Sequence, residues 1–121
     1  VGEIVGVRFP ERARWTVGVV RWLKRLNDGA TEFGLQFLGH AAISADLAPF
    51  VPETGTLGSD AYRVLVLDGE ASGAQPTVLC QPGIFQEMRP FQIGSRGAAY
   101  KVRALSLIET GGAFELFKAR R

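Results

Sequence analysis

Apolar and polar residues alternate along much of this chain, which is the pattern of half-buried β-strands. Residues 15–19 alternate in this way, and residues 33–37 repeat the pattern. Asn-Asp-Gly at 27–29 separates the two runs, and Asp-Gly is a strong hairpin signal because both corner positions tolerate positive φ. The sequence therefore predicts a β-hairpin over residues 14–38, with a further strand over residues 3–9.

The apolar positions change parity within the first long run. Val17 and Val19 are followed by Val20 and Trp22, so a regular strand would place Arg21 among core residues, which is costly. A β-bulge near Val19 and Val20 restores the apolar residues to one face and bends the strand sharply. Strands bent in this way form the corners of closed barrels.

The same order of features recurs near the C-terminus. Residues 100–104 alternate, and the apolar residues that follow continue on the other parity. A short strand, a long strand with a change of parity and a second short strand therefore occur in both 2–39 and 83–119. This order predicts two quasi-repeated three-stranded meanders, with two unrelated meanders as the alternative. At one constant offset, Trp15 pairs with Tyr100, Val17 with Val102, Val20 with Leu105, and Trp22 with Leu107.

Turn signals divide the rest of the chain. Residues 40–61 hold two prolines and two glycines, which predicts a long linker with at most one short helical turn over 41–47. Residues 62–81 are interpreted as a hairpin. With about eight strands and no convincing helix, the fold class is all-β, a small antiparallel barrel forming a single domain over 1–121. The chain begins with Val1 rather than Met, so we expect it to be part of a larger protein.

The aromatic residues repeat at strand spacing, which is typical of a core. We expect the paired meanders to curl shut, into one barrel or into two, with the indole and phenyl rings inside and the guanidinium groups outside. The aromatic residues assigned to this core are Trp15, Phe33, Phe37, Tyr100 and Phe114.

Residues suited to catalysis or metal binding are scarce. His40 has no partner at a spacing typical of a catalytic triad, and Cys80 is interpreted as a buried structural thiol within an apolar strand. Asp68 and Glu70 lie in a Gly/Ser loop, without the fixed geometry that paired carboxylates need. We therefore predict no enzyme activity, no metal and no cofactor. No apolar run approaches the ~18–20 residues of a membrane span, so membrane insertion is not expected.

The basic residues give a stronger signal for binding. Net charge is only +2, but eleven of the fourteen basic residues are arginine, whose planar fork suits phosphate. Clustered in one predicted interstrand loop, Arg8, Arg12 and Arg14 are candidates to converge on an anion. Arg21 precedes Trp22, an arrangement suited to a planar ligand. The alternative for these arginines is that they cover an exposed sheet face.

Residues 15–22 and 33–37, with the turn between them, resemble the closing hairpin of PilZ domains. PilZ domains are bacterial, cytoplasmic, non-catalytic receptors for cyclic di-GMP, so the resemblance implies a small antiparallel barrel with that role. The family motif R-x-x-x-R fits residues 8–12 and also 21–25. The second motif, [D/N]-x-S-x-x-G, is missing, because no serine follows two places after Asp28 or Asp68.

The resemblance implies a divergent PilZ-like regulatory module in the bacterial cytoplasm. It acts through contacts with other protein domains or binds cyclic di-GMP, with the arginines on the phosphates and Trp15 or Trp22 stacked on a base. The first alternative is a barrel that binds single-stranded nucleic acid, against which the near-neutral charge argues. The second is a structural or oligomerising domain that pairs through an open sheet edge.

Overall fold

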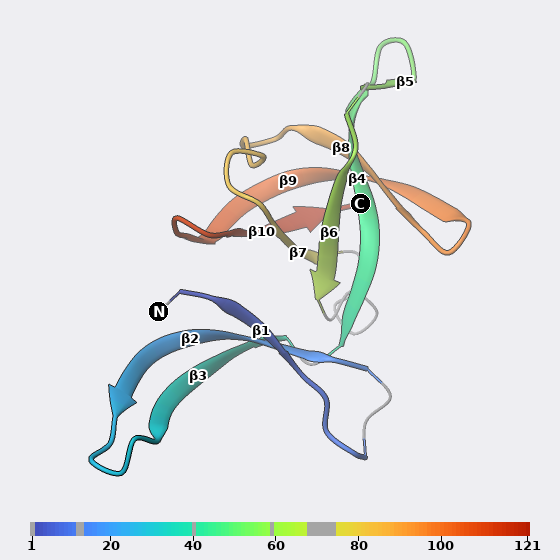
Figure 1. The fold of residues 1–121 in the computed structure, drawn as a ribbon. Helices are drawn as coiled ribbons and strands as arrows, with labels where there is room; N and C mark the ends of the chain where they lie inside the picture. The colour runs from blue at the N-terminus through green and yellow to red at the C-terminus, as the bar shows by residue number, and fades with distance from the viewer. Residues whose placement is uncertain (1, 12–13, 40, 59, 68–74) are drawn as a thin grey trace.

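The computed structural model describes residues 2–11, 14–39, 41–58, 60–67 and 75–121. Within these residues all regular structure is β, arranged in two sheets that lie one above the other (Figure 1). All the strand pairs are antiparallel, which confirms the predicted all-β antiparallel class. No helix long and apolar enough to cross a bilayer occurs in this part of the chain.

The first sheet is a three-stranded meander at the N-terminal end. Its strands are β1 (Ile4–Val7), β2 (Thr16–Arg25) and β3 (Thr31–Gly39), in the order β1-β2-β3. The predicted hairpin turn forms, with Gly29 at φ +86° and the Ala30 amide donating to Asp28 Oδ1 at 2.9 Å. The predicted bulge is confirmed one residue further on, because Arg21 has no partner on β3.

The second sheet closes into a barrel. Six strands follow one another around it in the order β4-β6-β7-β10-β9-β8, and pairing of β4 with β8 completes the ring. A short strand, β5, extends the end of β4. These strands are β4 (Ala42–Val51), β5 (Thr56–Leu57), β6 (Tyr62–Leu67), β7 (Thr77–Cys80), β8 (Pro90–Ser95), β9 (Ala98–Thr110) and β10 (Glu115–Arg120).

The linker predicted over 40–61 is wrong. Ten residues of it form β4, which pairs with both β6 and β8, and two more form β5, so ten strands are described rather than about eight. No helical turn forms over 41–47. Pro49 lies near the end of β4, and Pro52, Gly55 and Gly58 follow the strand. In the middle of β4, Ala45 and Leu47 are fully buried in the barrel. Pairing on both sides outweighs the local turn signals because it satisfies the backbone of a whole strand.

Two hydrophobic clusters hold the molecule together. One fills the barrel, around Phe91, Ile93 and Phe117. The other joins the outside of the barrel to the first sheet, where Val17 and Val19 of β2 pack against residues of β6, β7 and β10. The barrel residues in this second cluster are Leu67, Leu79, Phe114 and Leu116.

Only the second meander belongs to the closed barrel, and the predicted burial of three aromatic residues is wrong. Trp15, Phe33 and Phe37 are 51%, 52% and 45% exposed. Val17 and Val19 occupy the face of β2 that meets the barrel, whereas Phe33 and Phe37 lie on the other face, opposite Leu23 and Gly18. Within the described residues no further strand covers that face. Phe114 is buried as predicted, and Tyr100 is partly buried against the barrel core.

The two predicted meanders both form, and both long strands are irregular. Arg21 of β2 has no partner on β3, while Leu105 and Ile108 are both skipped where β9 pairs with β10. Val17 and Val102, which the constant offset paired, belong to different clusters, because Val17 packs on the outside of the barrel and Val102 lies inside it.

Candidate functional site

A groove lies where the first sheet meets the barrel, and we call it the junction groove. It has a volume of about 330 Å³. A second hollow of about 350 Å³ shares Ile4, Ser44 and Leu65 with it and continues along the barrel toward Arg63. The groove itself is lined by Ile4, Val5, Gly6, Trp15, Val17, Ala42, Ser44 and Leu65.

Trp15 forms one wall of the junction groove. It lies just before β2, and its carbonyl accepts a hydrogen bond of 3.1 Å from the amide of Ala42, at the start of β4. Its ring lies over Gly6, where a Cβ would come within 3.1 Å of the indole carbon Cε3. A side chain at position 6 would therefore disturb the ring. About half of the indole surface remains exposed, which leaves area for a planar ligand to stack on it.

Two of the predicted arginines lie at the same end of the sheet as Trp15. Val7 pairs with Thr16 as the last pair of β1 and β2, so the register places Arg8 opposite Trp15. Arg8 is exposed, and Arg14 is partly buried beside Trp15 in the sequence. Arg12 lies outside the described residues. The register thus places Arg8, Arg14 and Trp15 at one end of the first sheet, and of these three residues Trp15 lines the junction groove.

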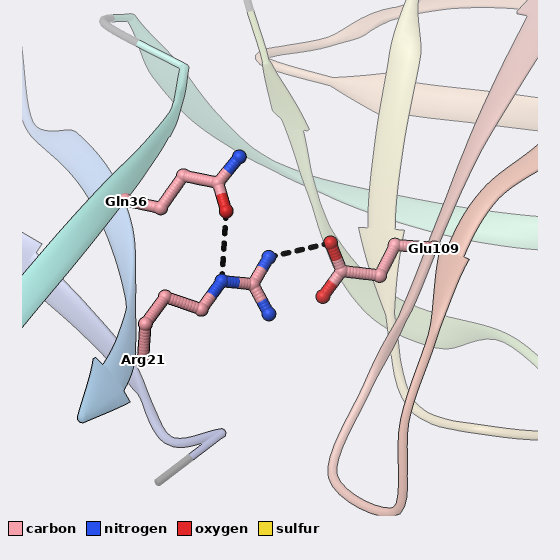
Figure 2. A network of polar contacts seen from close by, with 3 residues as sticks. All are labelled: Arg21, Gln36 and Glu109. Carbon is pink, nitrogen blue, oxygen red and sulfur yellow. Dashed lines mark hydrogen bonds and ion pairs between the residues drawn. The ribbon is translucent and has the colours of Figure 1, made fainter.

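Arg21 lies in a different place and makes different contacts. It is six residues beyond Trp15, or about 20 Å along an extended strand. Its Nη2 lies 2.6 Å from Glu109 Oε1 on β9, and its Nε donates to Gln36 Oε1 on β3 at 2.7 Å (Figure 2). The hydrogen bond from Arg21 lowers the pKa of Glu109. Arg21 therefore ties the first sheet to the barrel.

Trp22 is also separated from the junction groove. Its indole lies directly against Gly34 of β3, where any Cβ would overlap the ring. Almost half of its surface is exposed. Because it packs on the hairpin rather than beside Arg8, it does not share a site with Trp15.

Sequence reasoning missed the barrel side of the junction groove. Ala42 and Ser44 lie on β4, which was expected to be a linker, so no pattern placed them opposite β1. Leu65 lies on a strand that was predicted, but the position of that strand against the first sheet is a tertiary feature. A period-two pattern across residues 42–48 was the one local signal available.

The described residues show no group suited to holding a metal ion, that is, no cluster of three or more His, Cys, Asp or Glu side chains. Cys80 is buried as predicted, and burial together with the nearby charge of Glu115 raises the pKa of its thiol to about 12. A thiol with that pKa is a poor nucleophile at neutral pH. His40, Asp68 and Glu70 lie outside the described residues.

Comparison with known proteins points to one family. The family profile described as "Cyclic-di-GMP receptor FimW, middle PilZ domain" matches residues 1–43, which contain β1, β2 and β3. The chain is also 30% identical over 95 residues to the cyclic-di-GMP receptor FimW of Pseudomonas aeruginosa. That alignment covers 78% of this chain and 14% of FimW, so the chain spans a small part of this relative. No solved structure gives a significant match. The profile match, the similarity to FimW and the antiparallel barrel together identify this chain as PilZ-like.

Proposed function

We propose that this chain is a non-catalytic regulatory module of a bacterial cytoplasmic protein, and that it binds cyclic di-GMP in the junction groove. The observation that carries the proposal is the 30% identity to a cyclic-di-GMP receptor. The profile match over residues 1–43 adds support, because this segment contains Arg8, Arg12, Arg14 and Trp15.

The chemistry of the groove suits this ligand. Cyclic di-GMP carries two guanine bases on a ring that contains two phosphates. The half-exposed indole of Trp15 offers a stacking surface for a base, a contact that contributes about 1–3 kcal/mol. We assign the contacts to phosphate to Arg8 and Arg14, which lie at the same end of the first sheet as Trp15, and to Arg12 of the same loop. The serine of the [D/N]-x-S-x-x-G motif is missing from this chain. We therefore assign a hydrogen bond to the ligand to Ser44, which lines the groove together with Trp15.

Isothermal titration of the folded chain with cyclic di-GMP tests the proposal. We expect saturable binding, weakened about tenfold or more by Trp15→Leu and by Arg8→Gln, since each removes one stacking or charge-assisted contact. Trp22→Leu and Arg25→Gln are the matched controls, because they remove an equally exposed indole and an exposed arginine of the distant hairpin. Absence of heat at high micromolar ligand would rule out the receptor function. Equal losses in the variants and their controls would rule out the groove.

A second candidate function, self-association, rests on the open side of the first sheet. Neither β1 nor β3 pairs with a further strand among the described residues, so both present backbone edges. Leu23, Phe33 and Phe37 add an exposed apolar face to these edges. By contrast, the meander formed by β8, β9 and β10 has one face buried inside the barrel, and its outer strands pair with β4 and β7. We propose that a second copy of the chain covers this face.

Sedimentation velocity over a range of concentrations tests this self-association. We expect the sedimentation coefficient to rise with concentration for the unmodified chain. The double variant Phe33→Ser, Phe37→Ser should stay monomeric, because it removes the apolar face without touching the barrel. A monomer for the unmodified chain at several hundred micromolar would contradict the proposal.

A further inference from the structure

Basic side chains form a row on the outer face of the barrel, on the strands β8, β9 and β10. Arg103 of β9 pairs with Pro90 of β8 on one side and with Arg120 of β10 on the other. Residues that pair directly across strands point to the same face. Lys101 lies two residues before Arg103 and therefore shares that face, while Arg121 follows Arg120.

These side chains surround a hollow of about 270 Å³, which we call the basic hollow. Four of its lining residues are cationic, none is acidic, and an aromatic ring and two prolines supply an apolar wall. The residues that line it are Phe50, Pro52, Pro90, Lys101, Val102, Arg103, Arg120 and Arg121. The cavity is concave and small, which suits a compact ligand rather than a macromolecular surface.

The cations of the basic hollow have no acidic side chain as a partner among the described residues. Like charges placed directly opposite each other, as Arg103 and Arg120 are, destabilise a sheet. An anion bound between them would remove this repulsion.

Neutral groups hold three of the cations in place. Arg103 Nη1 donates to the carbonyl of Met88 at 3.0 Å, and Met88 itself has a φ of 64°, rare for a residue with a side chain. The Nζ atom of Lys101 lies 4.3 Å from the centre of the Phe50 ring. The guanidinium of Arg121 lies 3.9 Å from the centre of the Tyr100 ring. These contacts restrict the side chains without neutralising their charge, which lowers the entropic cost of binding an anion.

We propose that the basic hollow binds a di- or triphosphate group, separately from the junction groove. Guanidinium forks match the oxygens of phosphate in a bidentate manner, and two arginines with a lysine suit several phosphates better than one. A nucleoside attached to the phosphates would extend out of the hollow, past its apolar residues Phe50, Pro52 and Pro90. The site lies on residues outside the segment matched by the PilZ profile. It therefore does not depend on the proposed cyclic di-GMP site.

NMR titration of the ¹⁵N-labelled chain with tripolyphosphate, and separately with GTP, tests the proposal. We expect the amide signals of residues 101–103 and 120–121 to shift in a saturable manner, with a Kd of about 0.1–1 mM. Equal affinity for both probes identifies a site for free polyphosphate, whereas tighter binding of GTP identifies a nucleotide site. The proposal would be overturned if no saturable shift appeared at probe concentrations about 10-fold above the expected Kd. It would also be overturned if the shifts were confined to residues 8 and 14–15.

A matched pair of double variants distinguishes binding at the basic hollow from non-specific electrostatic attraction between the chain and the polyphosphate. Arg103→Gln with Arg120→Gln should weaken tripolyphosphate binding at least tenfold. Lys24→Gln with Arg25→Gln removes the same charge from the hairpin and should leave binding unchanged. Thermal unfolding and the NMR spectrum establish that each variant is folded. Equal losses in both pairs would overturn the proposal. Retention of cyclic di-GMP binding by the first pair distinguishes this site from the junction groove.

Discussion

Replacing Phe117 with alanine is expected to lower the free energy of unfolding by about 3–5 kcal/mol, which is the range for a phenylalanine removed from a core. Phe117 is fully buried at the centre of the barrel. Its ring stacks on that of Phe85, with centroids 5.5 Å apart, and on that of Phe91, at 6.2 Å. The substitution therefore removes two aromatic contacts and leaves a cavity. Urea unfolding followed by circular dichroism measures the change.

Phe33→Ala is the matched control for this experiment. Phe33 is 52% exposed on β3, so its truncation should change the free energy of unfolding by less than about 0.5 kcal/mol when the chain is measured at concentrations low enough to be monomeric. Phe117→Leu retains most of the buried volume and should cost about 1–2 kcal/mol, so it gives a measurable value if the alanine variant does not fold. Equal effects at positions 33 and 117 would contradict the assignment of the core to the barrel.

Replacing Glu115 with alanine is expected to lower the free energy of unfolding by about 2–3 kcal/mol. Glu115 is almost fully buried at the start of β10. Its Oε1 accepts a hydrogen bond of 2.6 Å from the amide of Gly83, and its Oε2 accepts one of 2.9 Å from the amide of Phe85. These charge-assisted bonds fix the segment between β7 and β8, and their loss leaves two backbone donors without a partner.

Glu109→Gln provides the comparison for Glu115→Ala. Glu109 forms the ion pair with Arg21 but lies nearer the surface, so its replacement should cost at most about 1 kcal/mol. Hydrogen exchange should show the amides of Gly83 and Phe85 losing protection in the Glu115 variant and keeping it in the Glu109 variant. Unchanged protection of both amides in the Glu115 variant would contradict the role assigned to this carboxylate.

Local patterns predicted the meander formed by β1, β2 and β3 well. The Asp-Gly turn at positions 28–29 and the alternation beside it are short-range signals, and both produced the expected hairpin. The change of parity at Val20 predicted the bulge at Arg21, because a charged side chain is excluded from an apolar face. These features depend on residues close together in the chain, so the sequence carries them directly.

The strand β4 was missed because its stability comes from distant partners. Its prolines and glycines are local turn signals, but pairing with β6 and β8 determines its conformation. The carboxylate of Glu115 was missed for the same reason. Its partners lie about 30 residues away, and no spacing in the sequence connects them.

The residues predicted to bind a ligand stay a prediction, and the structure adds where they lie along the first sheet. Arg8, Arg14 and Trp15 were expected to lie together, and the register of β1 with β2 brings them to one end of the sheet. Arg21 and Trp22 were expected to join them and do not, because they lie further along β2. The basic hollow was not predicted, since its cations come from two strands whose register only the barrel sets.

The sequence by itself determined the all-β class, the two meanders with their bulges and the resemblance to PilZ domains, because each depends on neighbouring residues. The tertiary structure decided which strands close the barrel. It also decided that the rings of Trp15, Phe33 and Phe37 are exposed, and that the junction groove and the basic hollow lie in different parts of the molecule. The physical reason is that the alternation of apolar and polar residues determines which residues share a face of a strand, whereas only long-range packing determines what covers that face.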